Sequence, residues 1–236
     1  GSPMIVALSF DADQTLWDFD AVKRRALRAT IAEMERRGDV PAGAVTPEAM
    51  DQARDVLVQR FRGATHRLEE VRERSFAEVL TAQGHPTPDA AAAVLVEHYM
   101  NIRFNQIELF ADVAPAIALL KDRYRLGLLS NGNTYPERCG LHDTFDAVVL
   151  GPDHGFEKPD PRAFAMVASQ LGVDVTELAH IGDDWDDVEG ANAAGATSIY
   201  LNRTGGDPGF RSDADHEVRD LDELVGLLDG ELRPQA

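Results

Sequence analysis

Four groups of polar side chains stand directly after predicted strands, or in the loops just beyond them. The groups are Asp11, Asp13 and Thr15, then Ser130, Asn131 and Gly132, then Lys158, and finally Asp183 with Asp187. Ligands of an open parallel sheet bind beyond the carboxyl ends of its strands, so these groups can share one site. Asp11 and Asp13 are two residues apart, which places their side chains on one face of an extended segment.

The acids of these groups outnumber the cations. Asp11, Asp13, Asp183 and Asp187 stand against one lysine, Lys158. Repulsion in such a cluster favours either raised pKa values or a bound cation. Ligands that are all oxygen, with no second histidine or cysteine nearby, favour Mg²⁺ over zinc. We therefore expect magnesium as the cofactor, with these four aspartates as candidate ligands.

The remaining groups suit a bound phosphate. Ser130 can donate its hydroxyl and Asn131 its amide, while the N–H groups around Gly132 precede a predicted helix whose dipole favours anions. Lys158 adds a positive charge. A phosphoryl group held between magnesium and a lysine is well placed for attack by a carboxylate.

An alternation of strands and helices positions these groups. An apolar run over 5–10 predicts a strand that ends at Asp11, and helical periodicity over 20–104 predicts four helices. Further strands are expected at 125–129, 147–150, 178–181 and 197–201, and further helices at 113–122, 134–141, 161–171, 185–194 and 220–228. This order predicts an α/β fold, a doubly wound parallel sheet with an inserted all-α helical bundle. The expected domains are a core of residues 4–18 and 108–236 and an insertion of residues 19–107.

The four groups, in this order and in these strand contexts, resemble the four motifs of the haloacid dehalogenase superfamily, which consists largely of phosphatases. The resemblance covers the chain from Ile5 to about Leu201 and implies a Rossmann-like core with a helical cap after the first motif. It implies that Asp11 is the nucleophile, forming an aspartyl-phosphate, and that Asp13 is the general acid and base.

The same resemblance implies roles for the other residues. Asp11, the backbone carbonyl of Asp13 and Asp183 would hold Mg²⁺, with Asp187 ligating directly or through water. Thr15, Ser130, Asn131 and Lys158 would orient Asp11 and the phosphoryl group. Asp183 and Asp187 show one of two spacings that the family tolerates, which leaves open which of them is the main ligand. Gln14 and Asp184 depart from the residues that are frequent at their positions.

Other residues carry weaker signals. Trp17 is interpreted equally well as packing or as a wall of the substrate pocket. His66, Arg67, Arg72 and Arg74 lie in the predicted cap, where solvated charged side chains are a better interpretation than contacts with a leaving group. The single cysteine, Cys139, lacks a histidine constellation and is interpreted as a small buried residue.

Composition excludes several classes of partner. The 236 residues include 23 Lys and Arg against 41 Asp and Glu, a formal net charge of −18, which repels nucleic acid and anionic lipid. The absence of a long apolar run argues against a membrane span. A single cysteine and no recognisable secretory signal favour the cytoplasm. We expect a monomer or homodimer.

The expected function is Mg²⁺-dependent hydrolysis of a small phosphomonoester, such as a sugar phosphate or nucleoside monophosphate. A phosphomutase shares these core residues and remains an alternative. A haloacid dehalogenase is another, although such enzymes lack the second acid that Asp13 supplies. The alternative that is not an enzyme is a phosphoacceptor signalling receiver, which the long helical insertion disfavours.

Overall fold

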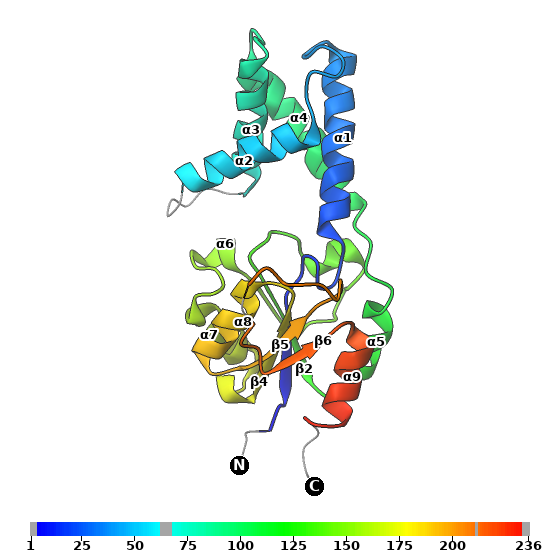
Figure 1. Cartoon of the computed structure of the whole chain (residues 1–236), viewed down its shortest axis with the longest axis vertical. Coiled ribbons are helices and arrows are strands. Elements are labelled where there is room, and N and C mark those ends of the chain that lie inside the picture. Colours follow the sequence, from blue (N-terminus) through cyan, green and yellow to red (C-terminus); the bar gives the residue numbers. More distant parts are fainter. Residues whose placement is uncertain (1–3, 62–67, 211, 233–236) are drawn as a thin grey trace. The chain divides into compact units, whose positions relative to one another are not determined.

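A computed structural model describes residues 4–61, 68–210 and 212–232. The chain divides into two compact units, Gly1–Asp18 with Glu108–Ala236, and Phe19–Ile107 (Figure 1). The first contains a parallel sheet with helices, and the second, inserted after the first strand, contains helices in its described part. The predicted fold class, an α/β sheet with an inserted helical bundle, is confirmed.

The sheet has six parallel strands in the order β3-β2-β1-β4-β5-β6. The strands are β1 (Ala7–Phe10), β2 (Arg125–Ser130), β3 (Ala147–Leu150), β4 (Leu178–Gly182), β5 (Thr197–Leu201) and β6 (His216–Val218). The prediction lacked β6, because three residues are too few to show a strand period.

Strand register explains why the polar groups meet. In the middle of the sheet, Phe10 at the end of β1 lies opposite Leu128 of β2 and Ile181 of β4. The residues that follow these positions therefore leave the sheet at the same edge, as expected for parallel neighbours. This edge carries Asp11 and, two residues beyond Ile181, Asp183.

Helices cover both faces of this sheet. In Figure 1, α7 (Pro161–Leu171) and α8 (Trp185–Ala194) lie on one side, and α5 (Val113–Leu120) and α9 (Leu221–Asp229) on the other. The Asp160 side chain caps α7 by accepting from Arg162 N, and Gly172 ends the helix in the left-handed conformation. Apolar residues of α7 pack on strand residues in one core cluster, which includes Ala7, Leu129, Val149, Phe164 and Val167.

The segment after β2 differs from the prediction. Instead of a helix over 134–141, a short 3-10 helix spans Pro136–Cys139. Proline begins this helix and Gly140, with a φ of 77°, ends it. A four-residue helix α6 (Gly151–His154) follows β3 and was also not predicted. Cys139 is half-buried rather than fully buried.

The inserted unit has a core of its own. It contains α1 (Phe19–Arg37), α2 (Pro47–Arg60), α3 (Leu68–Ala82) and α4 (Pro88–Asn105). The Thr46 side chain accepts from Ala49 N at the start of α2. Phe76 and Tyr99 meet edge to face, with centroids 5.6 Å apart, in a cluster of buried residues that includes Leu27, Met34, Met50, Leu80 and Leu95.

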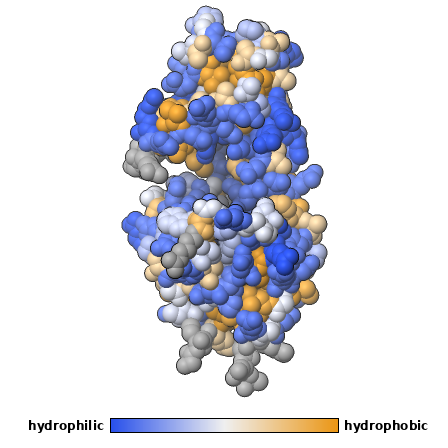
Figure 2. All heavy atoms as spheres, viewed as in Figure 1, coloured by the Kyte–Doolittle hydropathy of each residue, from blue (hydrophilic) through white to orange (hydrophobic). Residues whose placement is uncertain are grey.

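Hydrophilic residues cover much of the visible face of each unit, with smaller apolar areas between them (Figure 2). Across the described ranges, every helix is too short or too polar to cross a lipid bilayer.

Candidate active site

A buried lysine joins two carboxylates at the carboxyl edge of the sheet. Lys158 Nζ donates to Asp11 Oδ1 at 2.7 Å and to Asp187 Oδ1 at 2.6 Å. Lys158 is 4% exposed, and the two aspartates are also buried. Burial alone lowers the pKa of the ammonium group, but the two carboxylates outweigh it and hold the pKa above its ordinary value. Lys158 is therefore a permanent cation.

The third carboxylate of the cluster lacks such compensation. Carboxylate oxygens of Asp11, Asp183 and Asp187 all lie within 4.8 Å of one another. Burial and the neighbouring Asp11 raise the pKa of Asp183 to about 9. Oxygen donors this close suit one small, hard divalent cation. The residues present therefore fit a Mg²⁺ ion.

Thr15 links the first and last of the four groups. Its buried hydroxyl lies 3.2 Å from Asp11 Oδ2 and 3.4 Å from Asp183 Oδ1. A hydroxyl has one proton to donate, so it serves one of these oxygens at a time. Thr15 is thus placed to orient Asp11.

Asp187 is held by groups from three directions. Besides Lys158, the Nε2 atom of His180 lies 2.7 Å from Asp187 Oδ1, and Asp184 N donates to Oδ2 at 3.2 Å. The other ring nitrogen of His180 lies 2.8 Å from Ser9 Oγ. Burial raises the pKa of Asp187, but Lys158 and His180 outweigh this and lower it to about 2.

Sequence reasoning missed His180 and Ser9. His180 is 1% exposed and lies within the apolar strand β4, and its ring packs edge to face on Phe164. A polar residue inside an apolar strand was the available signal, because a buried polar group needs hydrogen-bond partners. Its partner Ser9 is 171 residues away in the sequence, and no local pattern reveals such a pair.

Asn131 acts on the backbone of Lys158. Its side chain accepts from Lys158 N at 2.8 Å and donates to Lys158 O at 2.9 Å. Both ends of the amide therefore fix the loop that carries the lysine. Ser130 Oγ accepts from Gly132 N at 2.9 Å, and a hydroxyl that accepts still has its own proton to donate.

Asp13 lies beside Trp17 and Gly132. The indole Nε1 of Trp17 donates to Asp13 Oδ1 at 2.8 Å. A Cβ atom on Gly132 would lie 2.8 Å from Asp13 Oδ2, so a larger residue at this position would displace the Asp13 carboxyl group. Trp17 is fully buried, while Asp13 keeps some exposure.

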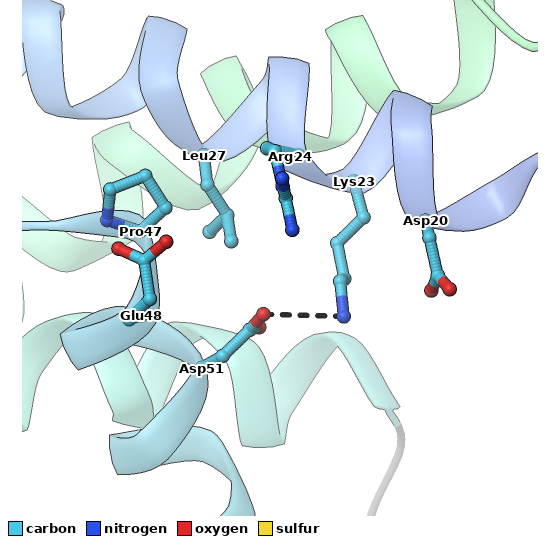
Figure 3. A pocket seen from close by; sticks show the side chains of 7 residues that line it. All are labelled: Asp20, Lys23, Arg24, Leu27, Pro47, Glu48 and Asp51. Atoms are coloured by element: carbon cyan, nitrogen blue, oxygen red, sulfur yellow. Dashed lines mark ion pairs between the residues drawn. The ribbon is translucent and has the colours of Figure 1, made fainter.

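The inserted unit has a charged pocket between α1 and α2 (Figure 3). Lys23 Nζ points across it to Asp51 Oδ2, 3.2 Å away. The acids that line it outnumber the cations, so it has no excess of positive charge to attract a phosphate. The lining residues are Asp20, Lys23, Arg24, Leu27, Pro47, Glu48 and Asp51.

The charged residues that were predicted to be solvated in this unit differ in their exposure. Arg72 is 4% exposed, bonds to Asp51 and lies over the Tyr99 ring, so its interpretation as solvated is wrong. Arg74 is exposed, as expected. His66 and Arg67 lie outside the described residues.

Comparisons with known proteins agree with this geometry. Residues 5–195 match the model of the haloacid dehalogenase-like hydrolase family. The glyceraldehyde 3-phosphate phosphatase of Methanopyrus kandleri is 30% identical over 208 residues, 85% of each chain. The 5-amino-6-(5-phospho-D-ribitylamino)uracil phosphatase of Escherichia coli is 28% identical over 209 residues, 86% of each chain.

The chain belongs to the haloacid dehalogenase-like hydrolase family. A solved structure of 2-haloacid dehalogenase from Pseudomonas syringae has the same fold, with a TM-score of 0.78 and 28% identity, and covers 96% of this hydrolase and 99% of that chain. This hydrolase is similar to both phosphatases and dehalogenases, so similarity alone does not identify its reaction.

Proposed function

We propose that this hydrolase is a Mg²⁺-dependent phosphatase of small phosphomonoesters, a class that includes sugar phosphates and nucleoside monophosphates. The observation that carries the proposal is the contact of Asp11 with buried Lys158 inside a cluster of carboxylates, with a second acid, Asp13, two residues later. The names of the two phosphatase relatives support the substrate class. Asp13 disfavours a dehalogenase, which needs no acid to protonate a halide.

The reaction has two steps at Asp11. First, a carboxylate oxygen of Asp11 attacks phosphorus, the bond to the leaving oxygen breaks, and that oxygen takes the proton of the Asp13 carboxylic acid. Second, the Asp13 carboxylate takes a proton from water, whose oxygen attacks phosphorus. The bond between phosphorus and Asp11 breaks, which releases inorganic phosphate and restores both carboxyl groups.

The surrounding residues hold these reactants. Lys158 and Thr15 orient the two oxygens of Asp11, and the lysine adds positive charge beside the phosphoryl group. Ser130 and the loop at Gly132 contribute polar contacts to the phosphoryl oxygens. Asn131 acts through Lys158, whose backbone it binds.

Asp11, Asp183 and the backbone carbonyl of Asp13 would hold Mg²⁺, with Asp187 directly or through water. When bound, the ion supplies positive charge that offsets the carboxylates and the charge of the phosphoryl group. Of Asp183 and Asp187, Asp183 is the better candidate for a direct ligand of the ion. Asp187 already accepts from Lys158, His180 and Asp184 N.

The two units have different roles in the proposed reaction. Residues 4–18 and 108–236 form the catalytic core, and residues 19–107 form the cap that confers specificity for the leaving group. A cap that closes over its substrate suits small molecules better than phosphoproteins.

The test is hydrolysis of p-nitrophenyl phosphate and of a panel of small phosphate esters, with Mg²⁺ and with a chelator. We expect activity that the chelator abolishes and Mg²⁺ restores. Asp11→Asn should be inactive yet folded by circular dichroism. Asp222→Asn, the same change on the exposed side of α9, should keep wild-type rates.

Other outcomes would replace the proposal. Chelator-insensitive activity, or none across the panel, contradicts it. Halide release from a haloacid without metal indicates a dehalogenase, and a trapped bisphosphate indicates a phosphomutase. An aspartyl-phosphate that persists for minutes without turnover indicates a signalling receiver.

A further inference from the structure

The indole of Trp17 has one polar atom, Nε1, which donates a hydrogen bond to the carboxyl group of Asp13. Trp17 is 0% exposed, and its Nε1 lies 2.8 Å from Asp13 Oδ1. An indole N–H can only donate, and a buried donor without an acceptor carries a desolvation cost of about 1–3 kcal/mol. The contact is therefore favoured from the side of the tryptophan as well as from that of the acid.

Backbone bonds fix the short loop that holds both residues. Gln14 N donates to Trp17 O at 2.8 Å, and Leu16 N donates to Ala12 O at 2.9 Å. Trp17 also pairs with Leu109, where the chain returns from the inserted unit to the first unit. The distance between the indole and the carboxyl group is thus set by local structure.

The other oxygen of Asp13 lies near a second element. Gly132, from the loop after β2, approaches so closely that a Cβ atom there would lie 2.8 Å from Asp13 Oδ2. Oδ1 accepts from the indole N–H, and Oδ2 occupies space next to Gly132 that a side chain there would enter. The bond to the indole opposes rotation of the Asp13 side chain.

We propose that Trp17 is a positioning residue that holds Asp13 in the orientation needed to protonate the leaving oxygen. The inference rests on the proposed phosphatase function. The indole N–H binds Oδ1, which leaves the proton to be carried on Oδ2, the oxygen nearer Gly132. Proton transfer depends on such geometry, because an acid has to meet the reacting oxygen within hydrogen-bond reach.

The test compares two changes at one position. Trp17→Phe keeps an aromatic ring but lacks the N–H, whereas Trp17→His keeps an N–H at the corresponding place of a five-membered ring but loses packing. Each variant is assayed for kcat/KM on p-nitrophenyl phosphate, whose leaving group needs no proton, and on an alkyl phosphate, whose leaving group does. Trp185→Phe, at an exposed tryptophan, is the matched control.

We expect Trp17→Phe to lose about tenfold or more on the alkyl ester and far less on the aryl ester, since general acid catalysis is worth 10²–10⁴-fold. Trp17→His should restore the alkyl to aryl ratio even if both rates fall, and Trp185→Phe should leave the ratio unchanged. Equal losses on both esters in Trp17→Phe would show a packing role only and overturn the inference.

A second measurement does not depend on folding of the tryptophan variants. In protein with ¹⁵N-labelled indole, the N–H resonance of Trp17 should be protected from exchange and should shift in Asp13→Ala. A resonance that Asp13→Ala leaves in place would overturn the inference. Absence of wild-type activity on every ester would instead count against the phosphatase function, which separates the two failures.

Discussion

At the scale of single residues, the candidate site contains a chain of hydrogen-bonded side chains that ends at Asp11. Ser9 contacts His180, His180 contacts Asp187, Asp187 contacts Lys158, and Lys158 contacts Asp11. Each link is 2.8 Å or shorter and joins buried groups. The position of the lysine therefore depends on a histidine that does not touch Asp11.

His180→Leu should lower kcat by about tenfold with little change in KM, because Asp187 loses one donor that fixes it beneath Lys158. His180→Gln should recover much of the loss, since its terminal amide keeps an N–H near the place of Nε2. Steady-state kinetics on one ester measures both. Equal rates in the leucine variant and the wild type would show that Lys158 needs no such support.

In the proposed magnesium site, Asp183 should make binding of the ion depend on pH. Burial and Asp11 raise the pKa of this carboxyl group to about 9 in the metal-free protein, so it carries a proton at neutral pH. Mg²⁺ has to displace that proton. The rise in Tm on adding Mg²⁺ should therefore grow from pH 6 to pH 9, as measured by thermal denaturation. Asp183→Asn should remove most of the metal effect, and a rise independent of pH would contradict the assignment.

The acids and the lysine of the site could be predicted from the sequence because each lies directly after a strand or in the segment that follows it, a position that a linear pattern reveals. The orientation of these side chains could not be predicted from the sequence. Trp17 was interpreted as packing or as a pocket wall, and its bond to Asp13 depends on the local turn geometry. Similarly, the amide of Asn131 was expected on phosphate, but it binds the backbone of a residue 27 positions away.

At the scale of elements, α8 has to approach α7 closely. A Cβ atom on Gly190 of α8 would lie 2.3 Å from Phe164 of α7 and 3.0 Å from Pro159. The same helix is capped by Asp184 and carries Asp187 on its first turn. The spacing of α7 and α8 therefore affects the ion pair between Lys158 and Asp187.

Gly190→Ala should destabilise the fold by about 1–3 kcal/mol through overpacking and should lower activity by displacing Asp187. Gly226→Ala is the matched control, because it makes the same change in α9 with nothing within 4 Å. There alanine should stabilise by about 0.5–1 kcal/mol. Urea denaturation and kinetics of both variants provide the measurement, and equal effects of the two changes would contradict the close approach.

Asp112 joins three elements by one carboxylate. It accepts from Arg203 and from Leu221 N at the start of α9, and it precedes α5. Burial raises its pKa, but Arg203 and the backbone N–H outweigh this and leave the pKa below its ordinary value. Its contribution to stability is therefore present above the unfolded pKa and is lost as pH falls through the folded one.

Asp112→Asn should destabilise the protein by about 1–3 kcal/mol at pH 7. The difference from the wild type should shrink from pH 7 to pH 3, because pH 3 lies below the unfolded pKa of about 3.9 and protonation there favours the unfolded chain. Urea denaturation at both pH values measures it. A difference that stays constant with pH would mean that the charge of Asp112 contributes little.

Element boundaries show what a linear pattern can and cannot predict. Strands of four or more residues, such as 147–150, were predicted close to where they lie, because their burial is visible in the sequence. The helix predicted over 134–141 was wrong, since Pro136 and Gly140 permit only a short 3-10 helix. Which strands pair was not predictable from local pattern, because pairing joins segments far apart.

At the scale of the whole molecule, the net charge of −18 repels the anionic ester that the site is proposed to bind. Added salt shortens the range of that repulsion from about 30 Å at 0.01 M to about 10 Å at 0.1 M. With Mg²⁺ saturating, kcat/KM for a phosphate ester should rise over this range while kcat stays nearly constant. A steady fall with salt would show that local positive charge at the site dominates.

The central place of β1 has a consequence for biosynthesis. This strand is translated before its partners β2 and β4, which begin at Arg125 and Leu178. Between β1 and β2 the ribosome translates helices α1 to α5, and the contacts within these helices are local enough to form during translation. Asp11 therefore gains its contact with Lys158, and through it with Asp187, only after α8 has been translated, about 170 residues later.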